Sequence, residues 1–369
     1  GDTLSIWQEA SDPDGMGALN YSWQISSDNS HWPSNSEVGT SSTYAIADGD
    51  QGKKIRAVIS YTDNEGHSEQ ITTVAKDIFY AASSNEGITA TGQSGNDLLI
   101  GSNNADTLDG AEGDDEIQGG DGDDSIKGGT GNDTLYGGGG NDTIYGGYGV
   151  DTIYGGDGND ILRSSATNNN DDATETQLID AGAGDDYVYA TGDQKVLLGD
   201  GDDYFSGTFR YLDAGAGDDR ISAPIWGYDW RHPYENQSKI EFLDGGEGYD
   251  ILEISGTWPN VNYGDTHLRD AIVNFEEIRL PNDNINDFWA LGNQAASSGE
   301  TLVIDADYRN ASSQNFKYLG EANITYKGSD RDLSGHDTVI LGSGNDTVTL
   351  NQGADVITAG AGNDTIDGG

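Results

Sequence analysis

The chain has 369 residues, of which 55 are glycine and only 34% are hydrophobic, and its 65 acidic residues against 17 basic ones give a formal net charge of −48. The negative charges of such an acidic chain repel one another, and its composition is close to that of disordered proteins. We therefore expect a divalent cation to be part of the fold. The charge excludes nucleic acids and anionic membrane surfaces as partners, and the lack of cysteine excludes disulfides and thiolate metal sites. No segment approaches the roughly 18 apolar residues of a membrane span, so we expect no membrane insertion.

Residues 1–78 alternate polar and apolar positions in short runs, which predicts an antiparallel β-sandwich with Trp23 as a core anchor. Three segments, 11–15, 21–24 and 48–56, resemble the immunoglobulin-like modules of large bacterial surface adhesins. The resemblance implies a spacer role, and we expect a linker over 79–91 before the next domain. Asp12 and Asp14 are expected to be turn carboxylates, with a calcium ion at a domain junction as the alternative.

A repeat of nine residues runs through 92–163. Each unit has an aspartate, a glycine five positions before it and a large aliphatic residue two positions after it, so the units read Gly-Gly-x-Gly-x-Asp-x-U-x with U aliphatic. The aspartates are Asp97, Asp106, Asp115, Asp124, Asp133, Asp142, Asp151 and Asp160, and the glycines at position 1 are Gly92, Gly101, Gly110, Gly119, Gly128, Gly137, Gly146 and Gly155.

Each repeat position has a physical reason. The glycines allow the positive φ of a tight turn, and their carbonyl oxygens together with the aspartate carboxylate are the hard ligands that calcium prefers. The x-U-x segment is a minimal strand with one inward side chain, and two units make one coil of a parallel stack with about 4.7 Å between coils. One aliphatic residue per unit cannot offset the entropy lost on ordering, so several bound calcium ions are expected to stabilise the fold.

The segments 119–126 and 128–135 resemble the calcium-binding repeats of the RTX (repeats-in-toxin) family. The resemblance implies an all-β chain with a parallel β-roll or solenoid and calcium in its turns. Val150 and the substituted glycines at the ends of the run predict fewer or weaker ions there.

The strict period lapses over 164–336 and returns over 337–369. Degenerate units in the middle have nearly doubled spacing, which predicts one calcium turn per coil, and we expect a continuous solenoid over 92–369, with a separate inserted domain as the alternative. The further predicted metal ligands are Asp186, Asp203, Asp219, Asp250, Asp337, Asp346, Asp355 and Asp364, and the carbonyl groups of the eight position-1 glycines are expected to join the aspartates.

Specificity is expected where the repeat breaks down. An aromatic-rich segment and one further tryptophan interrupt the degenerate region, with Trp226, Tyr228, Trp230, Arg231, Tyr234 and Trp258 as candidate ligand-binding residues. These rings could stack on sugars or hold a peptide; the alternative is that they cap or fill the solenoid core. Tyr136, Tyr145 and Tyr154 share one repeat position and are expected to form outward ladders that stabilise the sheets.

The favoured function is a calcium-dependent binding or adhesion module of a secreted RTX adhesin, which the resemblance implies is exported by type I secretion and folds outside the cell. The expected partners are a cell-surface glycan or peptide and the other domains of a longer parent chain. No catalytic role is expected, because none of the five histidines lies at motif spacing from a partner. The alternative is a non-catalytic calcium-binding module of a secreted lyase or epimerase, or of a surface-layer protein.

Overall fold

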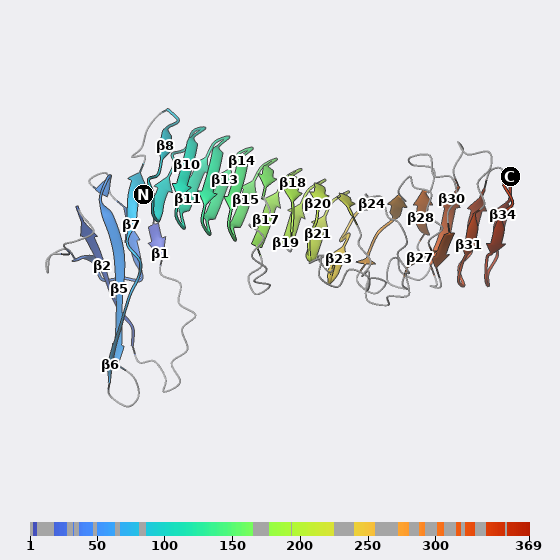
Figure 1. Cartoon of the computed structure of the whole chain (residues 1–369), viewed down its shortest axis with the longest axis horizontal. Helices are drawn as coiled ribbons and strands as arrows, with labels where there is room; N and C mark the ends of the chain where they lie inside the picture. The colour runs from blue at the N-terminus through green and yellow to red at the C-terminus, as the bar shows by residue number, and fades with distance from the viewer. Residues whose placement is uncertain are drawn as a thin grey trace. The chain divides into compact units, whose positions relative to one another are not determined.

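The computed structural model describes most of the repeat region and parts of the remaining chain (Figure 1). The described residues are 3–5, 18–27, 32, 37–46, 50–62, 67–80, 86–164, 177–192, 194–224, 240–254, 272–279, 288–291, 301–305, 315–318, 322–328, 337–350 and 353–369. Among them every extended element is a β-strand, and they include no helix that is long and apolar enough to cross a membrane. The chain divides into two compact units, Gly1–Ile153 and Tyr154–Gly369.

The N-terminal part of the first unit is antiparallel. Strand β2 (Asn20–Ser26) pairs with β5 (Lys54–Thr62) and with β3 (Glu37–Gly39), while β6 (Ser68–Thr72) and β7 (Lys76–Tyr80) both pair with β5. A separate ribbon joins β1 (Thr3–Ser5) to β4 (Thr43–Ala45). Alternating strands are therefore present as predicted, and the immunoglobulin-like sandwich itself stays a prediction.

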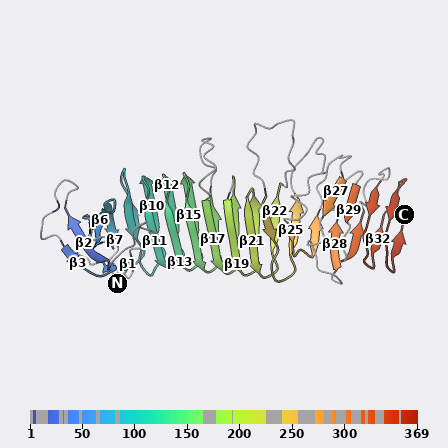
Figure 2. The same cartoon turned by 90° about the horizontal axis from the view of Figure 1, so that it is seen from below.

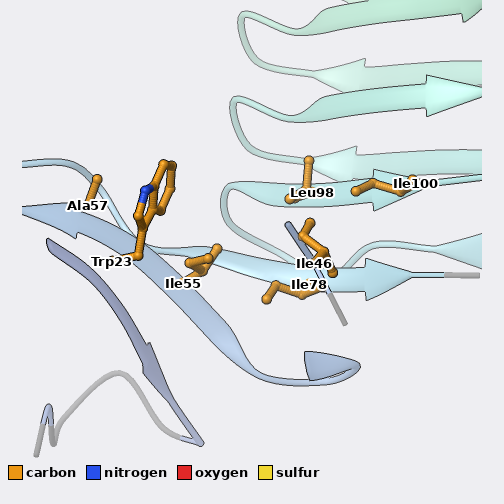
Figure 3. Close-up of a cluster of buried hydrophobic side chains, with 7 residues drawn as sticks. All are labelled: Trp23, Ile46, Ile55, Ala57, Ile78, Leu98 and Ile100. Atoms are coloured by element: carbon orange, nitrogen blue, oxygen red, sulfur yellow. The ribbon is translucent and has the colours of Figure 1, made fainter. Parts of the chain in front are cut away.

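Strand β7 connects this antiparallel sheet to the repeat region. It pairs antiparallel with β5 on one side and parallel with β9 (Asp97–Ile100) on the other. One buried cluster spans the junction, and Figure 3 shows side chains of β7 and β9 in the same cluster as those of β2 and β5. Its members are Trp23, Ile46, Ile55, Ala57, Ile78, Leu98 and Ile100. Trp23 is thus a core residue, as predicted, and the range expected to be a linker contains the end of β7 and all of β8 (Thr89–Thr91).

The repeats of the first unit form a parallel stack with two sheets (Figure 1). Strands pair with the strand two positions along, so each coil of two nine-residue units adds one rung to each sheet. One sheet contains β8, β10 (Thr107–Glu112), β12 (Ser125–Thr130) and β14 (Thr143–Tyr148), and the other contains β7, β9, β11 (Glu116–Asp121) and β13 (Thr134–Gly139).

Strand β15 (Thr152–Asp157) contains the boundary, and the second unit continues with the same kind of parallel pairing (Figure 2). One sheet runs through every even strand: β16 (Ile161–Arg163), β18 (Tyr187–Ala190), β20 (Tyr204–Gly207), β22 (Arg220–Ala223), β24 (Ile251–Ile254), β26 (Glu277–Arg279), β28 (Thr301–Asp305), β30 (Asn323–Lys327), β32 (Thr347–Thr349) and β34 (Thr365–Asp367).

The odd strands of the second unit form two sheets. One contains β17 (Gln177–Ala183), β19 (Gln194–Asp200), β21 (Tyr211–Ala216), β23 (Phe242–Asp244) and β25 (Ile272–Val273); the other contains β27 (Phe288–Leu291), β29 (Asn315–Tyr318), β31 (Thr338–Ile340) and β33 (Val356–Thr358). Within the second unit, the even sheet joins the degenerate coils and the C-terminal repeats in one parallel stack, and a continuous solenoid over 92–369 stays a prediction.

The inward aliphatic residues of the repeats form the core. Leu99, Ile117, Ile126 and Leu135 are each 0% exposed, which confirms the predicted out-in-out alternation. The exceptions lie in the last two strands, which are at the ends of their sheets: Ile357 in β33 is partly buried, and Ile366 in β34 is 52% exposed.

Turns in each unit belong to one of two edges of the stack. The first edge contains the turns that lead from an odd-numbered strand to the next even-numbered strand. The second edge contains the turns that lead from an even-numbered strand to the next odd-numbered strand. In the first unit both edges carry regular repeat turns. In the second unit the first edge keeps such turns at 155–160, 181–186, 198–203, 214–219 and 245–250, while on the second edge the connections from β16 to β25 differ in sequence and length.

Candidate metal centre

The predicted ligand aspartates lie at the start of strands with their carboxylates turned into the stack. Thirteen of them are between 0% and 3% exposed: Asp97, Asp106, Asp115, Asp124, Asp133, Asp142, Asp151, Asp160, Asp186, Asp203, Asp219, Asp250 and Asp346. Asp337, Asp355 and Asp364, nearer the C-terminal end, are half-buried. Carboxylates are almost never buried to this extent without a compensating partner.

One carboxylate oxygen of each aspartate has a defined partner. The backbone N–H of an aspartate donates to Oδ1 of the aspartate one coil further on, so the side chains form a ladder along each edge. The N···O distances are 2.8 Å for Asp97 to Asp115, 2.7 Å for Asp106 to Asp124, 2.9 Å for Asp115 to Asp133, 2.8 Å for Asp124 to Asp142, 3.1 Å for Asp133 to Asp151, 2.7 Å for Asp160 to Asp186, 2.7 Å for Asp186 to Asp203, 2.8 Å for Asp203 to Asp219, 2.9 Å for Asp219 to Asp250, 2.9 Å for Asp337 to Asp355 and 3.1 Å for Asp346 to Asp364.

The second carboxylate oxygen of these residues is buried and accepts no hydrogen bond. This holds for Oδ2 of Asp115, Asp124, Asp133, Asp151, Asp186, Asp203, Asp219, Asp250 and Asp346 and for Oδ1 of Asp97. A buried charged oxygen without a partner is strongly unfavourable. Its regular recurrence along the turns therefore fits a row of cation ligands.

Glycine at repeat position 1 makes room for this oxygen. A Cβ placed on Gly119 would be 2.3 Å from Oδ2 of Asp124 and 2.6 Å from the carbonyl oxygen of Gly137 in the next coil. The same convergence occurs at Gly110, with Asp115 Oδ2 at 2.3 Å and the Gly128 carbonyl oxygen at 2.6 Å. A carboxylate oxygen of one turn and a carbonyl oxygen of the next therefore approach the same point, between two coils.

The donor set suits calcium. Among the described residues no group of three or more His, Cys, Asp or Glu side chains is arranged to hold a metal, so a cation in these turns would take most of its ligands from backbone carbonyl oxygens. Calcium accepts about six to eight oxygen ligands in flexible geometry, whereas zinc favours nitrogen and sulfur. The residues present therefore fit calcium.

The protonation of the turn aspartates depends on whether a cation is bound beside them. Burial raises the pKa of Asp124 and Asp133 from 3.8 to about 7, against the lowering by the backbone N–H that each accepts and with a smaller contribution from the neighbouring aspartates. Burial likewise raises the pKa of Asp115 and Asp151 to about 6. Without a cation, Asp124 and Asp133 would be about half protonated at neutral pH, whereas Asp115 and Asp151 would be mostly ionised. A cation between the turns would displace those protons and favour the carboxylate form.

Glycine at positions 2 and 4 has a separate role in the backbone. Gly120 and Gly122 have φ of 114° and 122°, a region open almost only to glycine, and the equivalent residues of later turns follow them. Ala111 occupies position 2 of its turn with φ of 79°. It is therefore a strained residue in an otherwise regular turn.

Position 5 of the repeat carries a second ladder, which the sequence analysis did not predict. The side-chain oxygen of an Asn or Asp there accepts the backbone N–H of the position-5 residue one coil on, for example Asn96 from Asp114 at 3.1 Å and Asp202 from Asp218 at 2.8 Å. The signal was visible as the frequent Asn or Asp at that position. Val150 still donates to Asn132 at 2.8 Å, so this substitution keeps its own N–H satisfied.

On the second edge of the second unit, polar side chains that contact one another stand in place of the aspartates. Gln194 donates to Oε1 of Gln177 at 2.6 Å, and both residues precede a buried aliphatic residue by two positions, as the repeat aspartates do. In the following coils Arg210 pairs with Glu241 at 2.8 Å at the same place. Calcium-type turns therefore continue on the first edge alone over β17–β24, as the doubled spacing predicted.

The candidate ligand-binding residues Trp226, Tyr228, Trp230, Arg231, Tyr234 and Trp258 lie outside the described residues. Strand β22 ends at Ala223 and β23 begins at Phe242, so the chain crosses between sheets there at the second edge.

The model of the RTX calcium-binding nonapeptide repeat family matches residues 91–126, 109–144, 127–162, 136–169, 178–194 and 340–369. No curated protein and no solved structure matches the chain. The matched segments contain the regular coils and one degenerate coil, and many of the unpartnered carboxylate oxygens lie in their turns, whereas those of Asp203, Asp219 and Asp250 lie outside them. The matched segments of this chain are therefore RTX calcium-binding nonapeptide repeats, and multiple calcium ions are their cofactor.

Proposed function

We propose that this chain is a calcium-dependent extracellular binding module of a secreted RTX adhesin. The observation that carries the proposal is the row of buried aspartates, ten of which have one buried carboxylate oxygen without a hydrogen bond, as a cation ligand would. Extracellular modules bind calcium with affinities of about 10⁻⁴ to 10⁻³ M, far above cytosolic calcium levels. The chain would remain unfolded during export and fold outside the cell, because an ion that binds only the folded state stabilises it by mass action.

Recognition is assigned to the second edge of the second unit. There the Gln177–Gln194 contact and the Arg210–Glu241 ion pair replace the calcium ladder, so coil geometry at this edge does not depend on a metal. The two connections that contain the candidate aromatic residues, 224–241 and 255–271, join strands at this same edge. Calcium turns would hold the stack along the first edge, and the second edge would be free to carry sequences that bind a glycan or peptide by aromatic stacking and hydrogen bonds.

A glycan and peptide array probed in the presence of calcium tests the assignment. Wild-type protein should bind a defined class of probe, and Trp226→Ala and Trp230→Ala should abolish that binding while the far-ultraviolet circular dichroism stays unchanged. The matched control is Tyr145→Ala, which removes an exposed ring, 40% accessible, from the first unit. Binding that survives both tryptophan variants would refute the assignment.

The proposal gives this chain no catalytic role of its own. A product assay on acidic polysaccharides, run with calcium on the same preparations, addresses this directly. Release of shortened or unsaturated products by the wild-type chain would contradict it and favour an enzyme instead.

A further inference from the structure

The turn between β25 and β26 is only three residues long, Asn274, Phe275 and Glu276, yet it occupies the position of a six-residue repeat turn. It lies on the first edge, directly after the turn 245–250 that ends with Asp250. The sequence shows no repeat here, and the family match does not include these residues. Backbone hydrogen bonds nevertheless assign the first and last residues of this turn to repeat positions.

The hydrogen bonds on both sides of the turn match those of a regular one. The N–H of Gly245 donates to the carbonyl of Val273 at 3.1 Å, as that of Gly92 donates to Asp109 at 2.7 Å. The N–H of Glu277 donates to the carbonyl of Asp250 at 3.1 Å, as a position-7 residue does in a regular coil. Asn274 therefore stands at position 1, and Glu276 stands at position 6.

The oxygens of this short turn lie where a regular turn has its calcium ligands. A Cβ placed on Gly245 would be 2.0 Å from the carbonyl oxygen of Asn274, which takes the place of the position-1 glycine carbonyl. Oε2 of Glu276 accepts the backbone N–H of Asp250 at 2.8 Å, which is the bond that an aspartate Oδ1 accepts in every preceding coil. The additional methylene of glutamate extends the carboxylate across the gap that the three missing residues leave.

Asp250 provides independent evidence for a ligand at this place. Its side chain is 0% exposed, Oδ1 accepts the N–H of Asp219 at 2.9 Å, and Oδ2 is buried without a hydrogen bond. A carboxylate oxygen that is buried without a partner is unfavourable, so its burial here indicates that a ligand compensates for it. Oδ2 of Asp250 shares this burial without a hydrogen bond with Oδ2 of Asp186, Asp203 and Asp219 in the preceding first-edge turns.

The short turn is also held rigidly. Asn274 has φ of 54°, and its Nδ2 donates to Oδ1 of Asp244 at 2.7 Å. Phe275 is 0% exposed and anchors the turn in the core. The Asn274 carbonyl and the Glu276 carboxylate are therefore placed before any ion binds.

We propose that Glu276 and the Asn274 carbonyl complete a calcium site with Asp250 between turns 245–250 and 274–276, and that this site ends the first-edge row of ions begun at 155–160. The proposal rests on the calcium loading described under the proposed function. It extends that row to a turn outside the nonapeptide pattern and adds a glutamate to its ligands.

Crystals of the full chain grown with terbium(III) in place of calcium test the site by anomalous scattering. A peak between turns 245–250 and 274–276 is expected, in line with peaks between 198–203 and 214–219. Peaks at the regular turns without one at the short turn would overturn this inference and leave the proposed function intact. No peak at any turn would refute both.

Ion counting by equilibrium dialysis against radioactive calcium provides a second, independent readout. Glu276→Gln should bind one ion fewer per chain than the wild type. Glu277→Gln is the matched control, because the adjacent Glu277 carboxylate pairs with Arg279 at 2.7 Å and accepts from Tyr249 at 3.2 Å, and should keep the wild-type count. An unchanged count in Glu276→Gln would overturn the proposal, and a misfolded variant leaves the crystallographic result to decide it.

Discussion

Removal of calcium at pH 7.5 should unfold the repeat stack, and acidification to about pH 5 without calcium should restore much of its β structure. The reason lies in the buried aspartates of the second unit. Burial raises the pKa of Asp186, Asp203, Asp219 and Asp250 from 3.8 to about 7. Each shift of about three pKa units corresponds to about 4 kcal/mol of free energy that disfavours the ionised folded state.

The direction of the pH dependence of stability follows from the number of protons that the folded and unfolded states bind. Between pH 4 and 7 the metal-free folded state holds protons on these aspartates that the unfolded chain has released, so its stability is fully present below about pH 4 and is lost as the pH rises through about 7. Because these aspartates face one another along one ladder, their shifts are coupled and do not add, but even one such penalty is a large part of the roughly 5–15 kcal/mol that stabilises an ordinary domain. The charges facing Asp203 reinforce this, because they are those of Asp219, Asp185 and Asp202.

Circular dichroism of the full chain in a chelator, titrated from pH 8 to pH 4.5 with and without added calcium, measures the effect. The β signal should appear on acidification in the chelator and stay constant with calcium. Repeating the titration in about 0.5 M sodium chloride distinguishes the effect of the buried aspartates from repulsion between exposed charges, because salt screens exposed charges and leaves buried ones nearly unaffected.

Two variants sharpen this test. Asp203→Asn mimics the protonated acid, so it should reduce the pH dependence in the chelator and raise the calcium concentration needed for folding. Asp202→Asn, at a position where asparagine already occurs in other turns, should change both far less, because the Asp202 charge is the smallest of the contributions that raise the pKa of Asp203. A metal-free chain that keeps its full β signal at pH 7.5, or that gains none at pH 5, would refute the reasoning.

Three further predictions concern the turns and the junction of the first unit. Ala111→Gly should raise stability by about 1 kcal/mol in calcium, because it relieves a positive φ of 79°; thermal unfolding measures it, and the exposed Ala105→Gly should give no such gain. Gly119→Ala should raise the calcium midpoint of folding at least about tenfold, since the new Cβ would be 2.3 Å from the Asp124 carboxylate, whereas Gly139→Ala, with no atom nearer than 3.6 Å, should behave as wild type in the same titration. Ile78→Ala should cost about 2 to 4 kcal/mol and should weaken hydrogen-exchange protection in the N-terminal sheet and the first coils together; protection lost in only one of them would show that the two fold independently.

The contact between the N-terminal strands and the first coil also predicts how calcium removal affects the N-terminal strands. Residues 1–78 were expected to form a separate module that would stay folded under chelation. Their buried cluster includes Leu98 and Ile100 from the first coil, and β7 pairs with β9. We therefore expect chelation to lower hydrogen-exchange protection around Trp23 as well.

Much of the repeat region was predictable because its information is local. A nine-residue period places the aspartate, glycine and aliphatic residue of every unit at fixed backbone positions, so the burial of Leu99 and the first-edge line of Asp186, Asp203 and Asp219 could be predicted without coordinates. The short turn at Glu276 could not, since it breaks the period and uses a longer side chain. Its equivalence to a repeat turn is visible only in backbone hydrogen bonds to the preceding coil.

The amino-acid pattern alone was sufficient for the all-β class, the calcium chemistry and the direction of each repeat side chain, because a strand alternates and a glycine turn recurs at a fixed interval. Contacts between distant segments required the folded chain. The pairing of β7 with β9, the Gln177–Gln194 contact and the Arg210–Glu241 ion pair join residues 17 to 31 positions apart. No periodic signal links such residues, since their proximity depends on the lengths of the intervening connections and on the order in which the coils stack.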